Sequence, residues 1–408
     1  MLKQIKQSKK LIDVCYDIRG PILEKADALE KKGHEILKLN IGNPAPFGFN
    51  APDDIISIVM KNLANAQGYM DSKGLISARQ AILQECLSYG IDGVQLEDIY
   101  LGNGVSELIS LSMQALISDG DEVLIPSPDY PLWTASVTLS GGNPVHYLCD
   151  EKSDWHPSIT DIESKINSRT RAIVIINPNN PTGAVYDEKV LTDIVELARK
   201  YELAIFADEI YGKITFNNAR FIPIASLSND VITVSFSGLS KSYRLAGFRC
   251  GWMVLSGAKQ RAQSYIEGLD ILSNMRLCSN VPAQFAVEPA LNKDSYAKEL
   301  TLPGSRLEKQ RDITWNLLNA IPGVSCVKPK GAFYLFPKLD PKIYKIGSDE
   351  NLVLDILSKE KILLVQGSAF NIEDNQHFRI VFLPSTVQLS DALGRIARIL
   401  ESLKLNKG

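Results

Sequence analysis

Short apolar segments alternate with stretches of helical periodicity from about residue 98 to 255, and this alternation limits the possible folds most strongly. The segments 99–101, 123–125, 172–176 and 204–207 are continuously apolar instead of alternating between apolar and polar residues. Continuous hydrophobicity is typical of strands that are covered on both faces, as in a parallel sheet with helices on either side. We therefore expect an α/β fold with a mainly parallel sheet.

The length of the chain predicts more than one domain. A chain of 408 residues exceeds the size of one typical hydrophobic core. We expect an N-terminal arm and part of a small domain over 1–50, a large domain over 51–298, and the rest of the small domain over 299–408. A long helical run over 257–276 leads out of the large domain. The last part of the chain mixes helices with short strands, which predicts an α+β arrangement.

Composition argues against several classes of protein. The net charge is −3 and no basic block occurs beyond the N-terminal tail, so nucleic-acid binding has little support. No window approaches about 18 uninterrupted apolar residues, and we expect no membrane span. Six scattered cysteines without a C-x-x-C pair predict reduced thiols in a cytoplasmic enzyme. The four histidines lack metal-ligand spacing, and we expect no metal site.

Lys241 is the residue around which the candidate site is organised. It lies among glycine and serine residues in 237–244, just after the apolar run 231–234, and Arg249 follows eight residues later. Ligands in α/β proteins bind where strands end in loops. A partly desolvated lysine there can lose its proton and attack a carbonyl group. Taken alone, Lys241 would be interpreted as an ordinary surface lysine, and only its combination with the other motifs favours a catalytic role.

A glycine-rich turn follows the strand at 99–101. The residues Gly104, Val105 and Ser106 would form the start of a helix, whose free N–H groups and serine hydroxyl could hold a phosphate. Glu107 stands where a dinucleotide fingerprint has its third glycine, so a nicotinamide cofactor is poorly supported. A plain capped turn is the alternative. The P-loop, G-x-S-x-G and H-E-x-x-H motifs are absent.

Two further strand ends carry polar residues. Asn180 lies in the loop 177–183, which is rich in asparagine and proline, and the alternative is a tight loop with self-bonding side chains. Asp208 follows the strand at 204–207, and a buried acid requires a cationic partner such as a protonated ring nitrogen. Tyr211 could donate its hydroxyl to the same ligand, although an ordinary helix cap would also explain the aspartate.

Arg379 lies within the apolar strand expected at 378–382. Its guanidinium fork suits the carboxylate of a substrate, and an internal Asp or Glu partner is the alternative. Together, a carbonyl-binding lysine, a phosphate cradle, an acid for a ring nitrogen and an arginine for a carboxylate match pyridoxal 5'-phosphate acting on an amino acid. These signals lie in separate segments, so their joint occurrence is more specific than any one of them.

Across almost its whole length the sequence resembles the class I aminotransferases of the aspartate aminotransferase fold, and within them the bacterial alanine (glutamate–pyruvate) aminotransferases. The matching passages are YDIRGP (16–21), LNIGNPAPFGF (39–49), DYPLWTA (129–135), IINPNNPTGAVY (175–186), FADEIY (206–211), GLSKSYRLAGFRCGW (238–252) and LLVQGSAFN (363–371).

The resemblance implies a large domain with a mainly parallel seven-stranded sheet, a smaller α+β domain, and a cytoplasmic homodimer with shared active sites. It implies reversible, ping-pong amino transfer from L-alanine to 2-oxoglutarate, which gives pyruvate and L-glutamate, with pyridoxal 5'-phosphate as the cofactor.

The resemblance also implies roles for individual residues. Lys241 would form a Schiff base with the cofactor and shuttle a proton, and Asp208 would keep the ring nitrogen protonated. Tyr211 and Asn180 would bind the phenolic oxygen, and Tyr130 would stack on the ring. The phosphate would be held by Gly104, Val105, Ser106, Ser240 and Arg249, with Tyr69 reaching in from the other subunit.

The substrate carboxylate would bind Arg379 beside Asn180, with Gly42 lining the pocket. Arg19 is the candidate for the distal carboxylate of glutamate, and its alternative is a surface ion pair. One position departs from the family pattern. Gly238 stands where the family often has Ser or Thr, so Ser237 or Ser240 would replace that phosphate contact.

Other functions stay open on the sequence alone. A pyridoxal-dependent β-lyase or an aminotransferase with aromatic or branched-chain preference would share most of these residues. A catalytically silent regulator on the same fold is disfavoured because Lys241, Asp208 and Arg379 are all present and no DNA-binding module is appended.

Overall fold

The computed structural model describes residues 5–11, 14, 20–293 and 295–405, and an eight-stranded sheet forms its centre. The predicted Arg19 lies outside the described residues. The strand order is β2-β9-β8-β7-β6-β3-β4-β5. The strands are β2 (Ile99–Gly102), β3 (Glu122–Ser127), β4 (Asn143–Asp150), β5 (His156–Pro157), β6 (Thr170–Ile176), β7 (Ala204–Asp208), β8 (Thr233–Gly238) and β9 (Gly251–Ser256).

The sheet is mainly parallel, which confirms the predicted fold class. Strand β9 runs antiparallel to both of its neighbours, and β5 runs antiparallel to β4. The pairs β3–β4, β3–β6, β6–β7 and β7–β8 are parallel. Seven strands have four to eight residues, in line with the seven expected, and the two-residue β5 adds an eighth at the edge.

Helices cover both faces of the sheet, as its continuously apolar strands require. Alternate residues of β6 point to opposite faces, so Ala172 and Val174 enter one core, whereas Ile173 and Ile175 enter another. The first core also holds side chains of α4 (Val105–Leu116), α5 (Leu132–Leu139) and α8 (Gln263–Met275). The opposite face packs against α3 (Ile76–Ser88), α6 (Ile159–Lys165), α7 (Glu188–Lys200) and α10 (Val287–Leu291).

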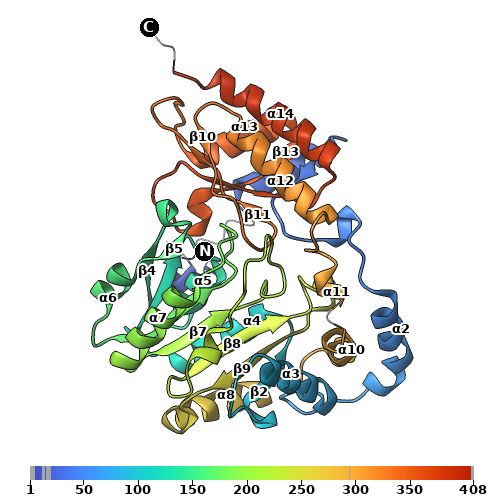
Figure 1. The fold of residues 1–408 in the computed structure, drawn as a ribbon, viewed down its shortest axis with the longest axis vertical. Coiled ribbons are helices and arrows are strands. Elements are labelled where there is room, and N and C mark those ends of the chain that lie inside the picture. Colours follow the sequence, from blue (N-terminus) through green and yellow to red (C-terminus); the bar gives the residue numbers. More distant parts are fainter. Residues whose placement is uncertain (1–4, 12–13, 15–19, 294, 406–408) are drawn as a thin grey trace.

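The C-terminal part combines three helices with short strands around its own hydrophobic core (Figure 1). The N-terminal β1 (Leu37–Lys38) joins it by parallel pairing with β13, and α1 (Pro21–Glu30) contributes Ile22 and Ala26 to the same core. The other elements are α12 (Arg306–Asn319), β10 (Val324–Ser325), β11 (Tyr334–Leu335), β12 (Lys338–Leu339), α13 (Asp349–Glu360), β13 (Ile362–Leu363), β14 (Val365–Gln366), β15 (Phe378–Val381) and α14 (Thr386–Ser402).

The connecting helices are shorter than the periodicity predicts. The helical run expected over 257–276 is α8, which begins only after a 3₁₀ turn at Lys259–Ala262, and α2 (Asp53–Asn62) is likewise flanked by a 3₁₀ turn. The short helices α9 (Val281–Gln284) and α11 (Ser295–Lys298) complete the set. Within the described ranges, no helix is both long enough and apolar enough to cross a membrane.

Candidate active site

A cavity of about 300 Å³ opens where the carboxyl ends of β6, β7 and β8 meet β15. This is the edge at which ligands bind in open α/β sheets. Eleven of the predicted site residues line it: Gly42, Val105, Ser106, Tyr130, Asn180, Asp208, Tyr211, Ser240, Lys241, Arg249 and Arg379. Five lining residues were not predicted: Ile41, Ile176, Ile210, Ala246 and Tyr334.

Lys241 lies in the loop after β8 and points into the cavity. Its Nζ donates a hydrogen bond to the carbonyl oxygen of Gly42 at 2.8 Å and lies 5.8 Å from the centre of the Tyr211 ring. The amine is therefore held by a neutral oxygen that cannot take a proton from it. Lys241 thus shares the cavity with Asp208, Asn180 and Arg379, and its amine could react there with a carbonyl carbon.

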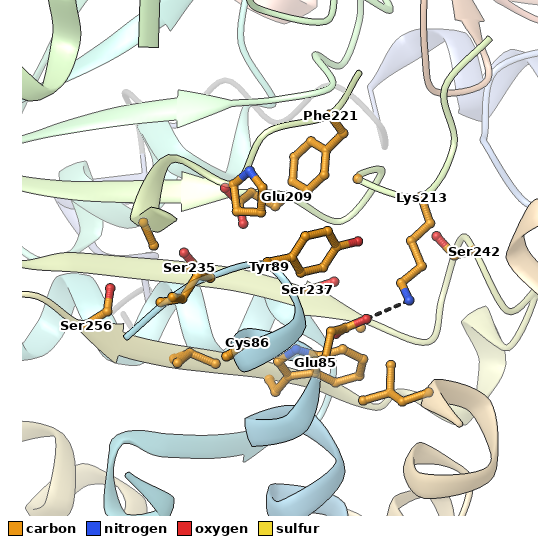
Figure 2. A pocket seen from close by; sticks show the side chains of 18 of the residues that line it. Glu85, Cys86, Tyr89, Glu209, Lys213, Phe221, Ser235, Ser237, Ser242 and Ser256 are labelled. Atoms are coloured by element: carbon orange, nitrogen blue, oxygen red, sulfur yellow. Dashed lines mark ion pairs between the residues drawn. The ribbon is translucent and has the colours of Figure 1, made fainter. Parts of the chain in front are cut away.

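The departure at Gly238 has a steric cause. Strands β8 and β9 approach so closely that a Cβ atom at Gly238 would lie 2.9 Å from both the Cys250 carbonyl oxygen and the Gly251 Cα. A serine or threonine is excluded there unless the strands move apart. Of the two proposed replacements, Ser240 lines the active-site cavity, whereas Ser237 lines a second cavity (Figure 2).

The predicted phosphate cradle is the N-terminus of α4. Gly104 precedes it with φ +83°, a left-handed conformation that favours glycine, and a Cβ atom there would lie 2.3 Å from Arg249 Nη2. Arg249 donates from Nη1 to the Ala246 carbonyl at 3.1 Å and from Nη2 to the Asn103 carbonyl at 3.4 Å. An exposed arginine is thus held beside free helix N–H groups, an arrangement that suits a phosphate dianion.

Asp208 ends β7 as a buried carboxylate, only 3% exposed. It accepts hydrogen bonds from Trp133 Nε1 at 3.3 Å and from the Ile210 backbone N–H at 3.4 Å. Burial raises the pKa of Asp208 to about 6, against the smaller opposing effects of these hydrogen bonds and of the Lys241 charge. A protonated ring nitrogen would supply the cationic partner that such a carboxyl group lacks. Trp133 was not predicted as a site residue. It lies in the matching passage 129–135, but nothing in that passage indicates that its N–H contacts Asp208.

Tyr211 forms a pair with Tyr334 of β11, which sequence reasoning also missed. The two hydroxyl oxygens are 2.6 Å apart, and the rings meet edge to face at 5.7 Å. Burial, with a further contribution from Tyr334, raises the pKa of Tyr211 well above its usual range. Tyr334 also borders Gly42, because a Cβ atom at Gly42 would lie 2.3 Å from the Tyr334 hydroxyl oxygen. No sequence signal separates Tyr334 from the aromatic residues around it in 333–336.

Arg379 lies on β15 with 5% of its surface exposed. It donates from Nη1 to Asn180 Oδ1 at 2.8 Å and from Nη2 to the carbonyl oxygen of Asn40. Its guanidinium lies 4.3 Å from the centre of the Tyr334 ring and 4.7 Å from that of Phe370. These oxygens and aromatic faces orient the guanidinium at the wall of the cavity that it lines.

Tyr69 does not line the cavity of its own chain. Its side chain is 81% exposed, more than any other large apolar or aromatic residue on the described surface except Ile5. Its predicted contact with the phosphate requires a second subunit and stays a prediction.

A second cavity is lined by residues that include Glu85, Glu209 and Lys213 (Figure 2). Glu209 follows Asp208 in the chain but lines this cavity instead of the first. Its Oε1 accepts a hydrogen bond from the Ile224 N–H at 3.1 Å. Burial, opposed by that bond and assisted by the charges of Asp208 and Glu85, raises the pKa of Glu209 to about 8. The two adjacent acids thus lie in separate environments.

Comparison with known protein families identifies the family of this chain. The model for the family "Aminotransferase class I and II" matches residues 34–396. The chain therefore belongs to the class I and II aminotransferases, as the sequence resemblance predicted.

Individual relatives are similar over nearly the full length. The glutamate-pyruvate aminotransferase AlaA of Escherichia coli (strain K12) is 58% identical over 98% of both chains. An alanine aminotransferase of Mycobacterium tuberculosis (strain H37Rv) is 56% identical over 98% of this chain and 93% of the relative. The crystal structure of an aminotransferase from Escherichia coli superposes with a TM-score of 0.97 at 57% identity, covering 99% of this chain and 100% of that one. An alanine aminotransferase from Pyrococcus furiosus gives a TM-score of 0.92 at 38% identity, covering 97% and 100%.

Proposed function

We propose that this protein is an alanine aminotransferase that moves the amino group of L-alanine reversibly to 2-oxoglutarate, giving pyruvate and L-glutamate. The single observation that carries the proposal is that Lys241, Asp208 and Arg379 face one cavity at the carboxyl edge of the sheet. The substrate pair rests on the relatives, because those that are at least 56% identical over most of this chain are named glutamate-pyruvate or alanine aminotransferases.

The residues of the cavity fit pyridoxal 5'-phosphate as the cofactor. When bound, this cofactor supplies an electron-accepting ring and carries the amino group between the two substrates. The α4 N-terminus, Ser240 and Arg249 would hold its phosphate, and Asp208 would pair with its ring nitrogen. Asn180 and Tyr211 would bind its phenolic oxygen, with Tyr130 against the ring. Because burial disfavours an isolated Asp208 charge, the cationic ring and this carboxylate would stabilise each other.

The chain's own groups would bind the amino acid and move its proton. Arg379 would bind the substrate α-carboxylate through its guanidinium fork, with Asn180 and Gly42 beside it. This anchor would orient the substrate so that its Cα–H bond, rather than its Cα–carboxylate bond, faces Lys241 in the same cavity, which would favour proton removal over decarboxylation. Lys241 Nζ would accept the Cα proton of the substrate and hold it for return in the later half of the reaction.

The assembly and location of the protein are part of the same proposal. The protein would be a cytoplasmic homodimer in which Tyr69, exposed on one chain, reaches the phosphate in its partner. Residues 51–298 would form the large domain, and 1–50 with 299–408 the small one. Size-exclusion chromatography with light scattering tests the dimer, and a mass of one chain, about 45 kDa, would contradict it.

A comparison of amino donors tests the substrate class. The protein, loaded with pyridoxal 5'-phosphate, is mixed with L-alanine, L-tyrosine or L-leucine, each without an acceptor, and the keto acid is quantified by mass spectrometry. The proposal expects up to one pyruvate per site from L-alanine, with much less keto acid from the other two. Preference for tyrosine or leucine would assign another aminotransferase specificity. Continuing release of ammonia and pyruvate from L-cysteine, whose β-thiol can leave as sulfide, would indicate a β-lyase.

A further inference from the structure

Glu107 occupies an unusual place beside a phosphate site. It lies in the first turn of α4, the helix whose N-terminus faces the active-site cavity through Val105 and Ser106. A carboxylate there is attracted to the positive end of the helix dipole. However, its charge would also repel a phosphate dianion that binds to the same helix end. Phosphate binding at this helix end therefore requires a cation that neutralises the Glu107 carboxylate.

Arg276 provides that cancelling charge. At the C-terminal end of α8, its Nη1 lies 2.5 Å from Glu107 Oε2, and the two side chains are only 13% and 23% exposed. Nη2 of the same guanidinium donates to the carbonyl oxygens of Ser72 at 2.8 Å and Leu101 at 3.2 Å. The arginine is thus fixed by backbone groups, and it holds the carboxylate in one orientation.

Glu107 in turn fixes the loop that leads into the helix. It accepts hydrogen bonds from the backbone N–H and the side-chain Nδ2 of Asn103, both at 2.8 Å. Asn103 also accepts from the Asn280 N–H at 2.8 Å, and its carbonyl accepts from Arg249. A continuous chain of contacts therefore runs from Arg276 through Glu107 and Asn103 to Arg249, the arginine that lines the cavity.

We propose that Glu107 and Arg276 are positioning residues of the phosphate cradle. Glu107 orders Asn103 and thereby Gly104 and Arg249, and Arg276 neutralises the carboxylate so that the helix N-terminus still attracts a dianion. The inference rests on the proposed cofactor. It predicts that loss of Arg276 harms binding through the uncompensated charge of Glu107, so that removal of this charge restores binding.

Cofactor affinity measures this effect separately from catalysis. The holoprotein is dialysed to equilibrium against graded pyridoxal 5'-phosphate or against pyridoxal, which lacks the phosphate, and bound cofactor is read from visible absorbance. Arg276→Met, which keeps an unbranched apolar stem and removes the guanidinium charge, should weaken pyridoxal phosphate binding about 10-fold. Pyridoxal binding should change less than about twofold. Inorganic phosphate should also bind this variant more weakly, which would be seen as a higher inhibition constant of phosphate against the phosphorylated cofactor.

Three further variants separate charge from packing. The double variant Glu107→Gln/Arg276→Met should recover most of the lost affinity, because no uncompensated anion remains. Arg276→Lys keeps the charge and should bind pyridoxal phosphate nearly as well as the wild type. This variant provides a test even if Arg276→Met does not fold. Arg261→Met removes an exposed arginine that pairs with Glu202 and should leave binding unchanged.

Several results would overturn the inference. If Arg276→Met lost the same affinity for pyridoxal phosphate as for pyridoxal, Arg276 would have a structural role alone. The same conclusion would follow if the double variant bound pyridoxal phosphate more weakly than Arg276→Met does. Wild-type affinity in Arg276→Met would refute the role of this residue directly. Failure of the wild-type protein to take up pyridoxal phosphate at all would instead refute the proposed function, and this inference with it.

Discussion

Arg379 and Asn180 are joined by a hydrogen bond of 2.8 Å, although 199 positions separate them in the chain. One lies on β15 among the C-terminal strands, and the other lies in the loop after β6 of the central sheet. The bond therefore links the two parts of the chain between which the cavity opens, and both residues line that cavity.

The first prediction concerns this arginine. Arg379→Lys keeps the charge but loses the planar fork, so it can replace only one of the two bonds to a carboxylate. We expect kcat/KM for L-alanine to fall about 100-fold, which corresponds to roughly 3 kcal/mol. Steady-state kinetics would check this, and a value within threefold of the wild type would contradict the role of Arg379 as the carboxylate anchor.

A second prediction addresses the tyrosine pair. Tyr334→Phe keeps the ring against Arg379 and removes only the hydroxyl that contacts Tyr211. Because one hydrogen bond contributes about 0.5–1.5 kcal/mol, we expect kcat to fall roughly 2- to 10-fold while the fold is kept. Tyr344→Phe is the matched control, since that buried tyrosine bonds to the Pro322 carbonyl far from the cavity. Equal kinetics of both variants would show that the pair has no function.

The third prediction tests the explanation for Gly238. A Cβ atom there would overlap the backbone of β9, so Gly238→Ser should destabilise the protein by about 1–3 kcal/mol. We expect a lower thermal midpoint in calorimetry. Gly394→Ala in α14, where nothing lies within 4 Å of the added atom, should leave the midpoint unchanged or raise it. If Gly238→Ser melted like the wild type, the steric explanation would be wrong.

The raised pKa of Glu209 leads to a prediction about pH and stability. Its pKa of about 8 exceeds the ordinary value of 4.5, so the folded state binds the proton more tightly than the unfolded state does. This contribution to stability is complete below about pH 4.5 and is lost as the pH rises toward 8. The glutamine side chain in Glu209→Gln is uncharged at every pH, so this variant does not lose that stability contribution as the pH rises.

The free energy of unfolding, measured with urea at pH 5.5 and at pH 8, checks this prediction. From pH 5.5 to pH 8, the free energy of unfolding should fall by roughly 2–3 kcal/mol less in Glu209→Gln than in the wild type. Glu35→Gln, which changes an exposed residue, should behave like the wild type. An unchanged pH dependence in Glu209→Gln would mean that Glu209 titrates near its ordinary pKa.

The sequence predicts the central sheet well, because continuous apolar runs leave few alternatives to strands covered on both faces. It also predicts Lys241, Asp208 and Asn180, since the carboxyl ends of parallel strands converge and polar residues stand out there. Tyr334 and Trp133 escape prediction because each is an aromatic residue in a largely apolar segment. Only the three-dimensional structure shows that the Tyr334 hydroxyl contacts Tyr211 and that the Trp133 N–H contacts Asp208. Gly238 is similar: its meaning depends on how closely β8 approaches β9, which no local pattern encodes.

The most direct test of the central claim is a coupled assay of amino transfer. Purified protein is mixed with L-alanine and 2-oxoglutarate, and pyruvate is measured through lactate dehydrogenase while the visible spectrum is recorded. Our account predicts a protein that absorbs visible light, changes its spectrum with alanine and forms pyruvate continuously, with turnover lost in Lys241→Ala. A protein that takes up no pyridoxal phosphate, or a Lys241→Ala variant that forms pyruvate at the wild-type rate, would contradict it.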